Sequence, residues 1–129
     1  MSFRTRLTAA AATVGALGTA LVLPAAIEPA PANAYTNYYG AIALNTSTGA
    51  YGRSWDYGSY GQARSAALSS CGYGCRVVTD FVNGCGAVAS STNYWGYGRA
   101  PSLYRAQSNA LSAAGGGYIY TWVCTSGHS

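Results

Sequence analysis

Few side chains in this sequence could transfer a proton near neutral pH, a step that most acid–base enzymes need. The one histidine, His128, follows Thr-Ser-Gly next to the C-terminus, where we expect the chain to be frayed. Asp56 and Asp80 stand outside any catalytic motif, and turn or capping roles are expected for both. We therefore predict no catalytic residue. A hydrolase using these three residues is an alternative that requires the tail to fold back onto one of the aspartates.

The first quarter of the chain has the features of a secretory signal peptide. Two arginines precede an apolar stretch from Leu7 to Leu23, and Ala32-Asn33-Ala34 has the small-x-small pattern that signal peptidase requires. We expect residues 1–34 to be removed, leaving residues 35–129 as one small domain that is secreted or associated with the cell wall. A retained membrane anchor is the alternative, since the apolar stretch approaches the roughly 20 residues that span a bilayer. After cleavage no stable membrane insertion is expected.

All four cysteines follow the predicted cleavage site, and an even number in a short exported chain favours disulfides over thiols. Pairing removes the thiolate that a Cys–His nucleophile would need. Four cysteines could also ligate zinc, but the exported context disfavours this alternative, and we predict no metal site. Gly115-Gly-Gly117 follows a predicted helix instead of opening one, so it is not a phosphate-binding loop. No cofactor is predicted.

Charge and aromatic content limit the class of partner. Residues 35–129 carry five arginines, two aspartates and no lysine, a weak electrostatic footprint that disfavours nucleic acid. The sequence has twelve tyrosines and three tryptophans, and rings beside arginines could stack on sugars or contact a partner protein. The structural alternative is that most of these rings fill a thin core. The candidate binding residues lie in two predicted hairpins, and they are Arg53, Trp55, Tyr57, Trp95, Tyr97 and Arg99.

Two segments of the chain resemble each other. The sequence SYGQARSAALSSCGYG (59–74) matches SLYRAQSNALSAAGGG (102–117), and upstream YGAIA (39–43) matches CGAVA (85–89) in the same order. We therefore predict two repeats within one domain, at about residues 38–83 and 84–126, because one unit alone would bury too little surface to offset its chain entropy.

Each repeat is interpreted as strand, strand, helix and strand. Hydroxyl N-caps at Ser59 and Ser102, with Gln62 completing a capping box at the first, begin the helices, and Gly72 supplies a left-handed stop. The predicted fold class is α+β, with the repeats sharing a sheet or a core on which the alanine faces of the helices pack closely. The expected elements are strands at 39–44, 50–55 and 76–82 and a helix at 59–71, then strands at 85–90, 94–99 and 118–124 and a helix at 102–114.

Four cysteines allow three pairings, which the sequence does not distinguish. We favour Cys71 with Cys75, closing a tight loop at a helix end, and Cys85 with Cys124, joining the first and last strands of the second repeat. In the loop-entropy account the longer bridge contributes about 4 kcal/mol, a large share of a small domain's stability.

The order of these motifs resembles a known family. Tyr39-Gly-Ala-Ile-Ala, Cys75-Arg-Val-Val and Asn83-x-Cys85-Gly-Ala resemble the secreted bacterial family catalogued as the domain of unknown function numbered 4189. The resemblance extends from Tyr38 to Ser126 and implies an exported protein of the kind found in actinobacteria, with no assigned activity or catalytic residues. Some members carry a further cysteine near the second helix end, where this chain has Ala114 or Tyr118.

The sequence thus predicts an exported, non-enzymatic module that binds a protein at the cell surface or outside the cell through the hairpin aromatics. The alternative is a cell-wall or glycan-binding protein in which Trp55 and Trp95 stack on sugar rings.

Overall fold

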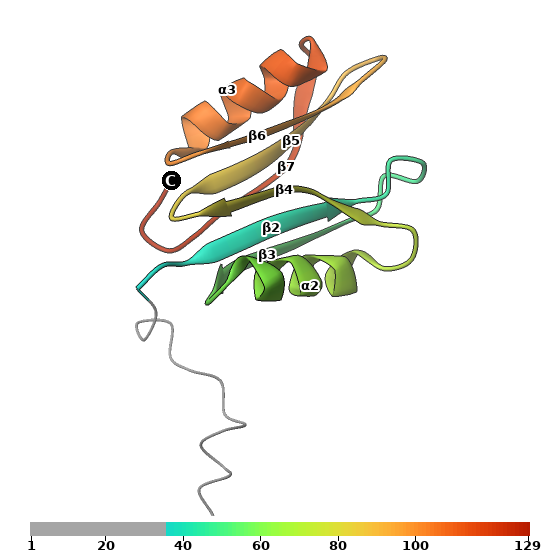
Figure 1. The fold of residues 1–129 in the computed structure, drawn as a ribbon. Coiled ribbons are helices and arrows are strands. Elements are labelled where there is room, and N and C mark those ends of the chain that lie inside the picture. Colours follow the sequence, from blue (N-terminus) through green and yellow to red (C-terminus); the bar gives the residue numbers. More distant parts are fainter. Residues whose placement is uncertain (1–35) are drawn as a thin grey trace, which may run out of the picture. The chain divides into compact units, whose positions relative to one another are not determined.

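The structure is a computed structural model that describes residues 36–129, so the predicted signal peptide lies outside the described residues. Every element expected from the sequence is present, with ends shifted by one or two residues (Figure 1). In chain order the elements are β2 (Tyr39–Leu44), β3 (Tyr51–Tyr57), α2 (Tyr60–Cys71), β4 (Arg76–Val82), β5 (Cys85–Ser90), β6 (Trp95–Ala100), α3 (Leu103–Ala114) and β7 (Tyr118–Cys124).

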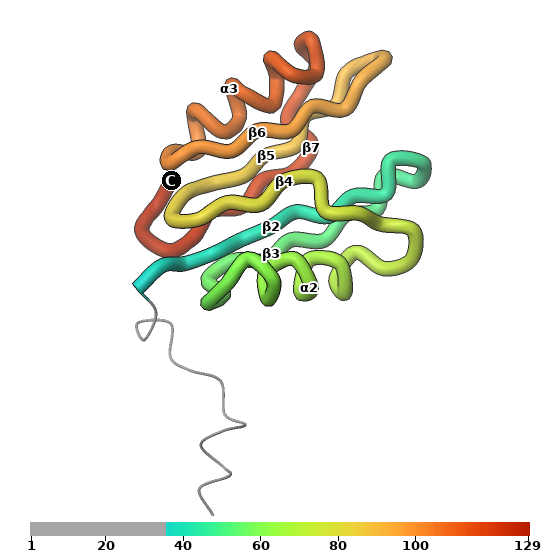
Figure 2. The backbone as a smooth tube through the Cα atoms, viewed as in Figure 1, coloured from blue at the N-terminus to red at the C-terminus, as the bar shows by residue number. Residues whose placement is uncertain are grey.

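The strands form two antiparallel three-stranded sheets, one from each half of the described chain. Their orders are β3-β2-β4 and β6-β5-β7, so the first strand of each half is central in its sheet. Figure 2 follows the chain through the first half and then through the same succession of turns in the second. The halves do not share a sheet. They share a core, because the two sheets pack face to face with one helix on each outer face.

Strand alternation sends small residues outward to the helices and larger residues inward. In β2, Ala41 and Ala43 belong to the cluster formed with α2, whereas Ile42 and Leu44 face the second sheet. In β5 the residue facing the first sheet is Val88. The domain therefore has two alanine-rich helix–sheet layers and one larger apolar layer between the sheets.

The helices lie unusually close to their sheets because the strands beneath them carry glycine. A Cβ atom added at Gly96 of β6 would lie 2.2 Å from the carbonyl oxygen of Ala110 and 2.4 Å from the amide nitrogen of Ala114, both in α3. The helix backbone thus rests directly on the strand, as the predicted close packing of the alanine faces requires.

Gly96→Ala should lower the free energy of unfolding by about 1–3 kcal/mol, because α3 must move outward to admit the methyl group. A matched control is Gly61→Ala in α2, where the added Cβ would meet only Ser59 Oγ at 4.0 Å. That change should leave stability unchanged or raise it by up to about 1 kcal/mol, since alanine is the better helix former. Urea denaturation of both variants measures the difference. Equal stability of the two variants would contradict this packing.

The predicted serine N-caps are confirmed. Ser59 Oγ accepts a hydrogen bond from the Gln62 amide at 3.2 Å, and Ser102 Oγ accepts one from the Arg105 amide at 3.3 Å. At the other end of α2, Gly72 has a φ of 99°, a conformation that favours glycine.

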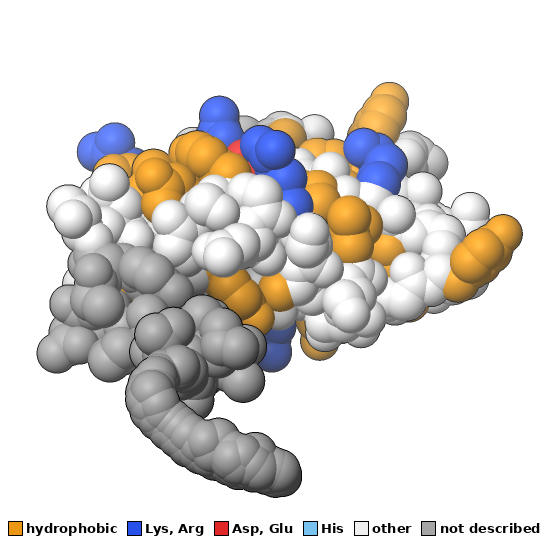
Figure 3. Space-filling view, turned by 60° about the horizontal axis from the view of Figure 1, so that its bottom comes forward, with side chains coloured by type: hydrophobic (Ala, Val, Ile, Leu, Met, Phe, Trp, Pro, Cys, Tyr) orange, Lys and Arg blue, Asp and Glu red, His pale blue; other side chains and the backbone are white. Residues whose placement is uncertain are grey.

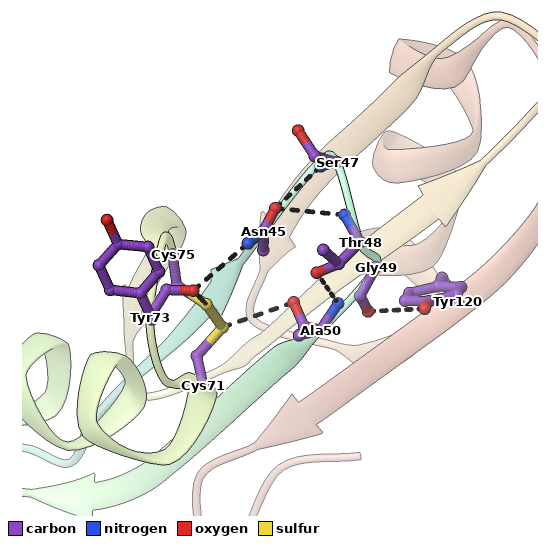
Figure 4. The surroundings of a disulfide bond; sticks show 9 residues. All are labelled: Asn45, Ser47, Thr48, Gly49, Ala50, Cys71, Tyr73, Cys75 and Tyr120. Carbon is purple, nitrogen blue, oxygen red and sulfur yellow. Dashed lines mark hydrogen bonds between the residues drawn. A yellow bond between two sulfur atoms is a disulfide. The ribbon is translucent and has the colours of Figure 1, made fainter.

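The two disulfides have the pairing favoured from the sequence. Cys71–Cys75 joins the end of α2 to the start of β4, and Cys85–Cys124 joins directly opposed residues of β5 and β7. Figure 4 shows the first of them beside the β2–β3 turn, where Asn45 Nδ2 donates to the Tyr73 carbonyl at 3.3 Å. This hydrogen bond connects the loop closed by Cys71–Cys75 to the β2–β3 turn.

Between the sheets, the ring of Phe81 occupies the space left by two glycines. Phe81 is only 3% exposed. A Cβ atom added at Gly40 in β2 would lie 2.5 Å from Phe81 Cζ, and one at Gly86 in β5 would lie 2.5 Å from Phe81 Cε1. In the strand registers Phe81 is opposite Gly40, and Val123 is opposite Gly86, so the halves differ at this position.

Candidate binding groove

The six candidate residues from the sequence fall on two strands at opposite edges of the sandwich. Arg53, Trp55 and Tyr57 lie on β3, at one edge of the first sheet, and the other three lie on β6, at one edge of the second. Across the interface β3 contacts β7, whereas β6 contacts β4. The structure therefore does not bring the two groups together into one aromatic surface.

The tryptophans differ in exposure. Trp55 is 52% exposed, and the neighbouring Tyr57 is also exposed. Trp95 and Tyr97 pack against the core between the sheets, and the Trp95 ring meets the Tyr120 ring edge-on with centroids 4.9 Å apart. These two rings contribute to the core.

Arg53 and Arg99 each bridge the two sheets. Arg53 Nη1 donates to the Trp122 carbonyl at 2.8 Å, and Arg99 Nη1 donates to the Asp80 carbonyl at 3.0 Å. Trp122 and Asp80 hold equivalent places in the two registers, opposite Ala87 in β5 and Ala41 in β2. At each edge of the sandwich an arginine thus fastens one sheet to a carbonyl of the other.

A groove lies between β4 and β6, and we call it the β4–β6 groove. It has a volume of about 350 Å³, and the residues that line it are Val77, Val78, Thr79, Asp80, Tyr97, Gly98 and Arg99. A second hollow of about 230 Å³ shares Arg99 and extends the groove past Tyr60, Val82 and Pro101. Tyr97 and Arg99, two of the candidate residues, therefore line a real depression.

The electrostatics of the groove centre on Asp80, whose side chain is 15% exposed. Arg64 Nε lies 2.6 Å from Asp80 Oδ2, and Arg99 Nη1 lies 3.2 Å from Oδ1. Arg76 adds a third guanidinium, positioned 6.0 Å from the centre of the Tyr97 ring. Two arginines thus bind one carboxylate, and a third lies further along the groove beside Tyr97. The face drawn in Figure 3 shows basic side chains beside apolar ones.

Three residues of the groove region were not among the candidate binding residues predicted from the sequence, namely Arg64, Arg76 and Asp80. The expectation of a turn or capping role for Asp80 is wrong, because the residue lies within β4 and binds two arginines. Asp80 alternates with the inward-facing Thr79 and Phe81 along the strand, a signal that it faces α2. The ion pair of Asp80 with Arg64 of α2 could have been predicted from this alternation.

The expectation of a frayed C-terminal tail is also wrong. The Ser126 amide donates to Asp56 Oδ1 at 2.8 Å and its hydroxyl binds Oδ2 of the same carboxylate, while His128 Nδ1 lies 2.9 Å from the Pro101 carbonyl. In a Ser–His–Asp relay the histidine imidazole lies between the serine hydroxyl and the aspartate carboxylate. Here the hydroxyl binds the carboxylate directly, so these contacts fasten the tail.

Within residues 36–129 no group of three or more His, Cys, Asp and Glu side chains is placed to hold a metal ion. In the same part of the chain no helix has the length and apolar character needed to cross a membrane.

The molecule is a small disulfide-bonded α+β domain, in which two similar halves share a core between their sheets and a groove runs between β4 and β6. The model of a domain of unknown function, DUF4189, matches residues 39–124, and the chain belongs to that family. The resemblance inferred from the motifs is confirmed.

Relatives and a solved structure agree with this assignment. The chain is 47% identical over 87 residues to Protein Rv1269c of Mycobacterium tuberculosis, covering 67% of this chain and 68% of that protein. Protein Mb1300c of Mycobacterium bovis matches to the same extent. The NMR structure of Rv1813c from Mycobacterium tuberculosis is similar with a TM-score of 0.56 and 27% identity, covering 94% of this chain and 98% of that one. The tandem arrangement of the two halves is thus shared with a solved structure.

Proposed function

We propose that this chain is an exported, non-enzymatic interaction module that binds a protein at the cell surface or outside the cell, with the β4–β6 groove as its contact surface. The observation that supports this proposal is a groove flanked by an edge strand from each sheet and bordered by three arginines. The two disulfides fit an oxidising compartment outside the cytoplasm.

Edge strands favour a protein partner because their outer backbone groups can pair with an extended segment. Within its sheet β4 pairs with β2, and β6 pairs with β5, so each has one side facing the groove. Val77 and Val78 add apolar contacts along the same strand. Arg99 covers the Asp80 carbonyl and leaves the rest of the β4 edge to a partner.

A second candidate function is cell-wall glycan binding at the opposite edge. It is favoured by the exposure of Trp55, whose ring face could stack on a sugar, with Tyr57 beside it on β3. Trp95, buried in part against Tyr120, would not contribute to such a surface.

Photo-crosslinking can test the location of the contact. A photoreactive phenylalanine analogue replaces Val82, which lines the groove extension and is exposed, or Tyr118, which is exposed on β7. In cells that produce the protein, the Val82 position should give a discrete crosslinked protein product that the Tyr118 position does not give.

Identical products from both positions, or none from either, would refute the groove as the contact surface. If Val82 gives no product and the protein instead pellets with purified cell wall, loss of pelleting in Trp55→Ala would establish the glycan alternative in its place.

A further inference from the structure

We infer that the β4–β6 groove recognises an extended peptide segment with at least two acidic side chains separated by apolar or small residues. This inference rests on the proposed function and names the chemistry of the partner. It is carried by the arrangement of Arg64, Arg76 and Arg99 along the groove.

Two of these arginines are held in place before any ligand arrives. Asp80 binds Arg64 through one carboxylate oxygen and Arg99 through the other, so one partly buried anion orients two guanidinium groups. Arg64 makes its contact through Nε, and Arg99 through Nη1. Both side chains are at least half exposed. A guanidinium has five N–H donors, so each retains donors for a ligand carboxylate.

The third arginine creates a separate basic subsite for an acidic side chain. Arg76 lies at the start of β4 and stands over the Tyr97 ring, at the other end of the groove from Tyr60 and Pro101. Its side chain is exposed and has no carboxylate partner among the salt bridges of the described residues. A ligand carboxylate could therefore bind Arg76 without displacing an internal ion pair.

The spacing of the two subsites fits an extended peptide. Arg76 and Asp80 are four residues apart in β4, and Tyr97 and Arg99 are two apart in β6. At about 3.3 Å per residue, these separations place the two basic positions roughly 7–13 Å apart. Acidic side chains two to four positions apart on a strand-like peptide span the same distance.

The walls of the groove favour a peptide over a polysaccharide or a nucleic acid. Stacking on a sugar or a base needs an open ring face, but Arg64 stands over Tyr60 at 5.4 Å and Arg76 over Tyr97 at 6.0 Å. The remaining walls include Val77, Val78 and Val82, which match aliphatic side chains between the acidic ones.

The probe is a fluorescent, strand-forming peptide in which two glutamates are four positions apart with valine and threonine between them. Binding to the purified, oxidised protein is followed by fluorescence anisotropy. Replacing both glutamates with glutamine should weaken binding by about tenfold or more, and raising the salt from about 50 to 500 mM should weaken it as well.

Arg76→Gln should weaken binding of the acidic peptide about tenfold, because it removes one subsite and leaves the Asp80 ion pairs intact. Arg105→Gln is the matched control, with the same charge loss at an exposed arginine of α3 that lines neither hollow, and it should bind as the wild type does. Thermal melting of both variants verifies that they are folded at the temperature of the assay.

Equal weakening by the two substitutions, or failure of the acidic peptide to bind, would overturn the inference. So would tighter binding of a sulfated polysaccharide or an oligonucleotide that is sensitive to Arg76→Gln, which would assign the groove to another polyanion. A protein crosslinked from Val82 whose capture is unaffected by Arg76→Gln would leave the proposed function standing and remove the acidic specificity alone.

Discussion

Replacing Cys85 and Cys124 together with alanine should lower the free energy of unfolding by about 4 kcal/mol. This bridge closes a loop with a sequence separation of 39, so its loss releases a large chain entropy in the unfolded state. It also removes a crosslink between directly opposed residues of β5 and β7, one of which is completely buried. Urea denaturation at neutral pH measures the effect.

The second disulfide provides the control. Cys71–Cys75 has a sequence separation of 4, so replacing both cysteines with alanine should cost only about 2 kcal/mol in the same account. The melting temperature of the wild-type protein should also fall when reductant is added. Equal costs for the two pairs, or an unchanged melting temperature after complete reduction, would contradict a stabilising role set by loop length.

The second large effect is expected from Phe81→Ala, which should lower the free energy of unfolding by about 3–5 kcal/mol. The ring fills the space between the two sheets against Gly40 and Gly86, so its removal leaves a cavity that glycines cannot fill. Because the cavity lies between the halves, both sheets should lose protection from amide hydrogen exchange. Chemical denaturation together with hydrogen exchange distinguishes this result from a local loss.

Double variants can identify the contact itself. Gly86→Ala should lower the free energy of unfolding by about 1–3 kcal/mol in the wild-type protein. The same change should cost less in the Phe81→Val background, because the atom nearest to the added Cβ belongs to the Phe81 ring. Gly40→Ala is the control. Its added Cβ would also lie 2.7 Å from the Ser54 carbonyl oxygen, a backbone atom that a smaller side chain at position 81 does not remove. Additive effects in the Gly86 pair would show that the ring does not fill this space.

Local patterns predicted most of the fold. The N-caps at Ser59 and Ser102 and the positive φ at Gly72 follow from hydrogen-bonding and steric rules that act within a few residues. The disulfide pairing followed from loop length and from the strand order within one repeat. The choice between a shared sheet and a shared core could not be made this way, because it depends on contacts between the two halves, which local patterns within one half do not specify.

The groove could not be predicted because it depends on how the two sheets are stacked. Val78 and Tyr97 line it together, although they lie in different halves, and only the contact of β4 with β6 across the interface brings them close. The hairpin aromatics were grouped because their places in the two repeats correspond. Face-to-face stacking sends corresponding strands to opposite edges, which separates Trp55 from Trp95.

Among the described residues one phenylalanine lies between the sheets, and it has a consequence for how the two similar halves pack together. Where the first half contributes Phe81, the second contributes Val123 at the matching place in its register. Two copies of the first half, stacked in the same manner, would bring two benzyl groups into a space that here accommodates one. The two halves therefore contribute side chains of different size at this position, and two copies of the first half could not pack together in the same manner.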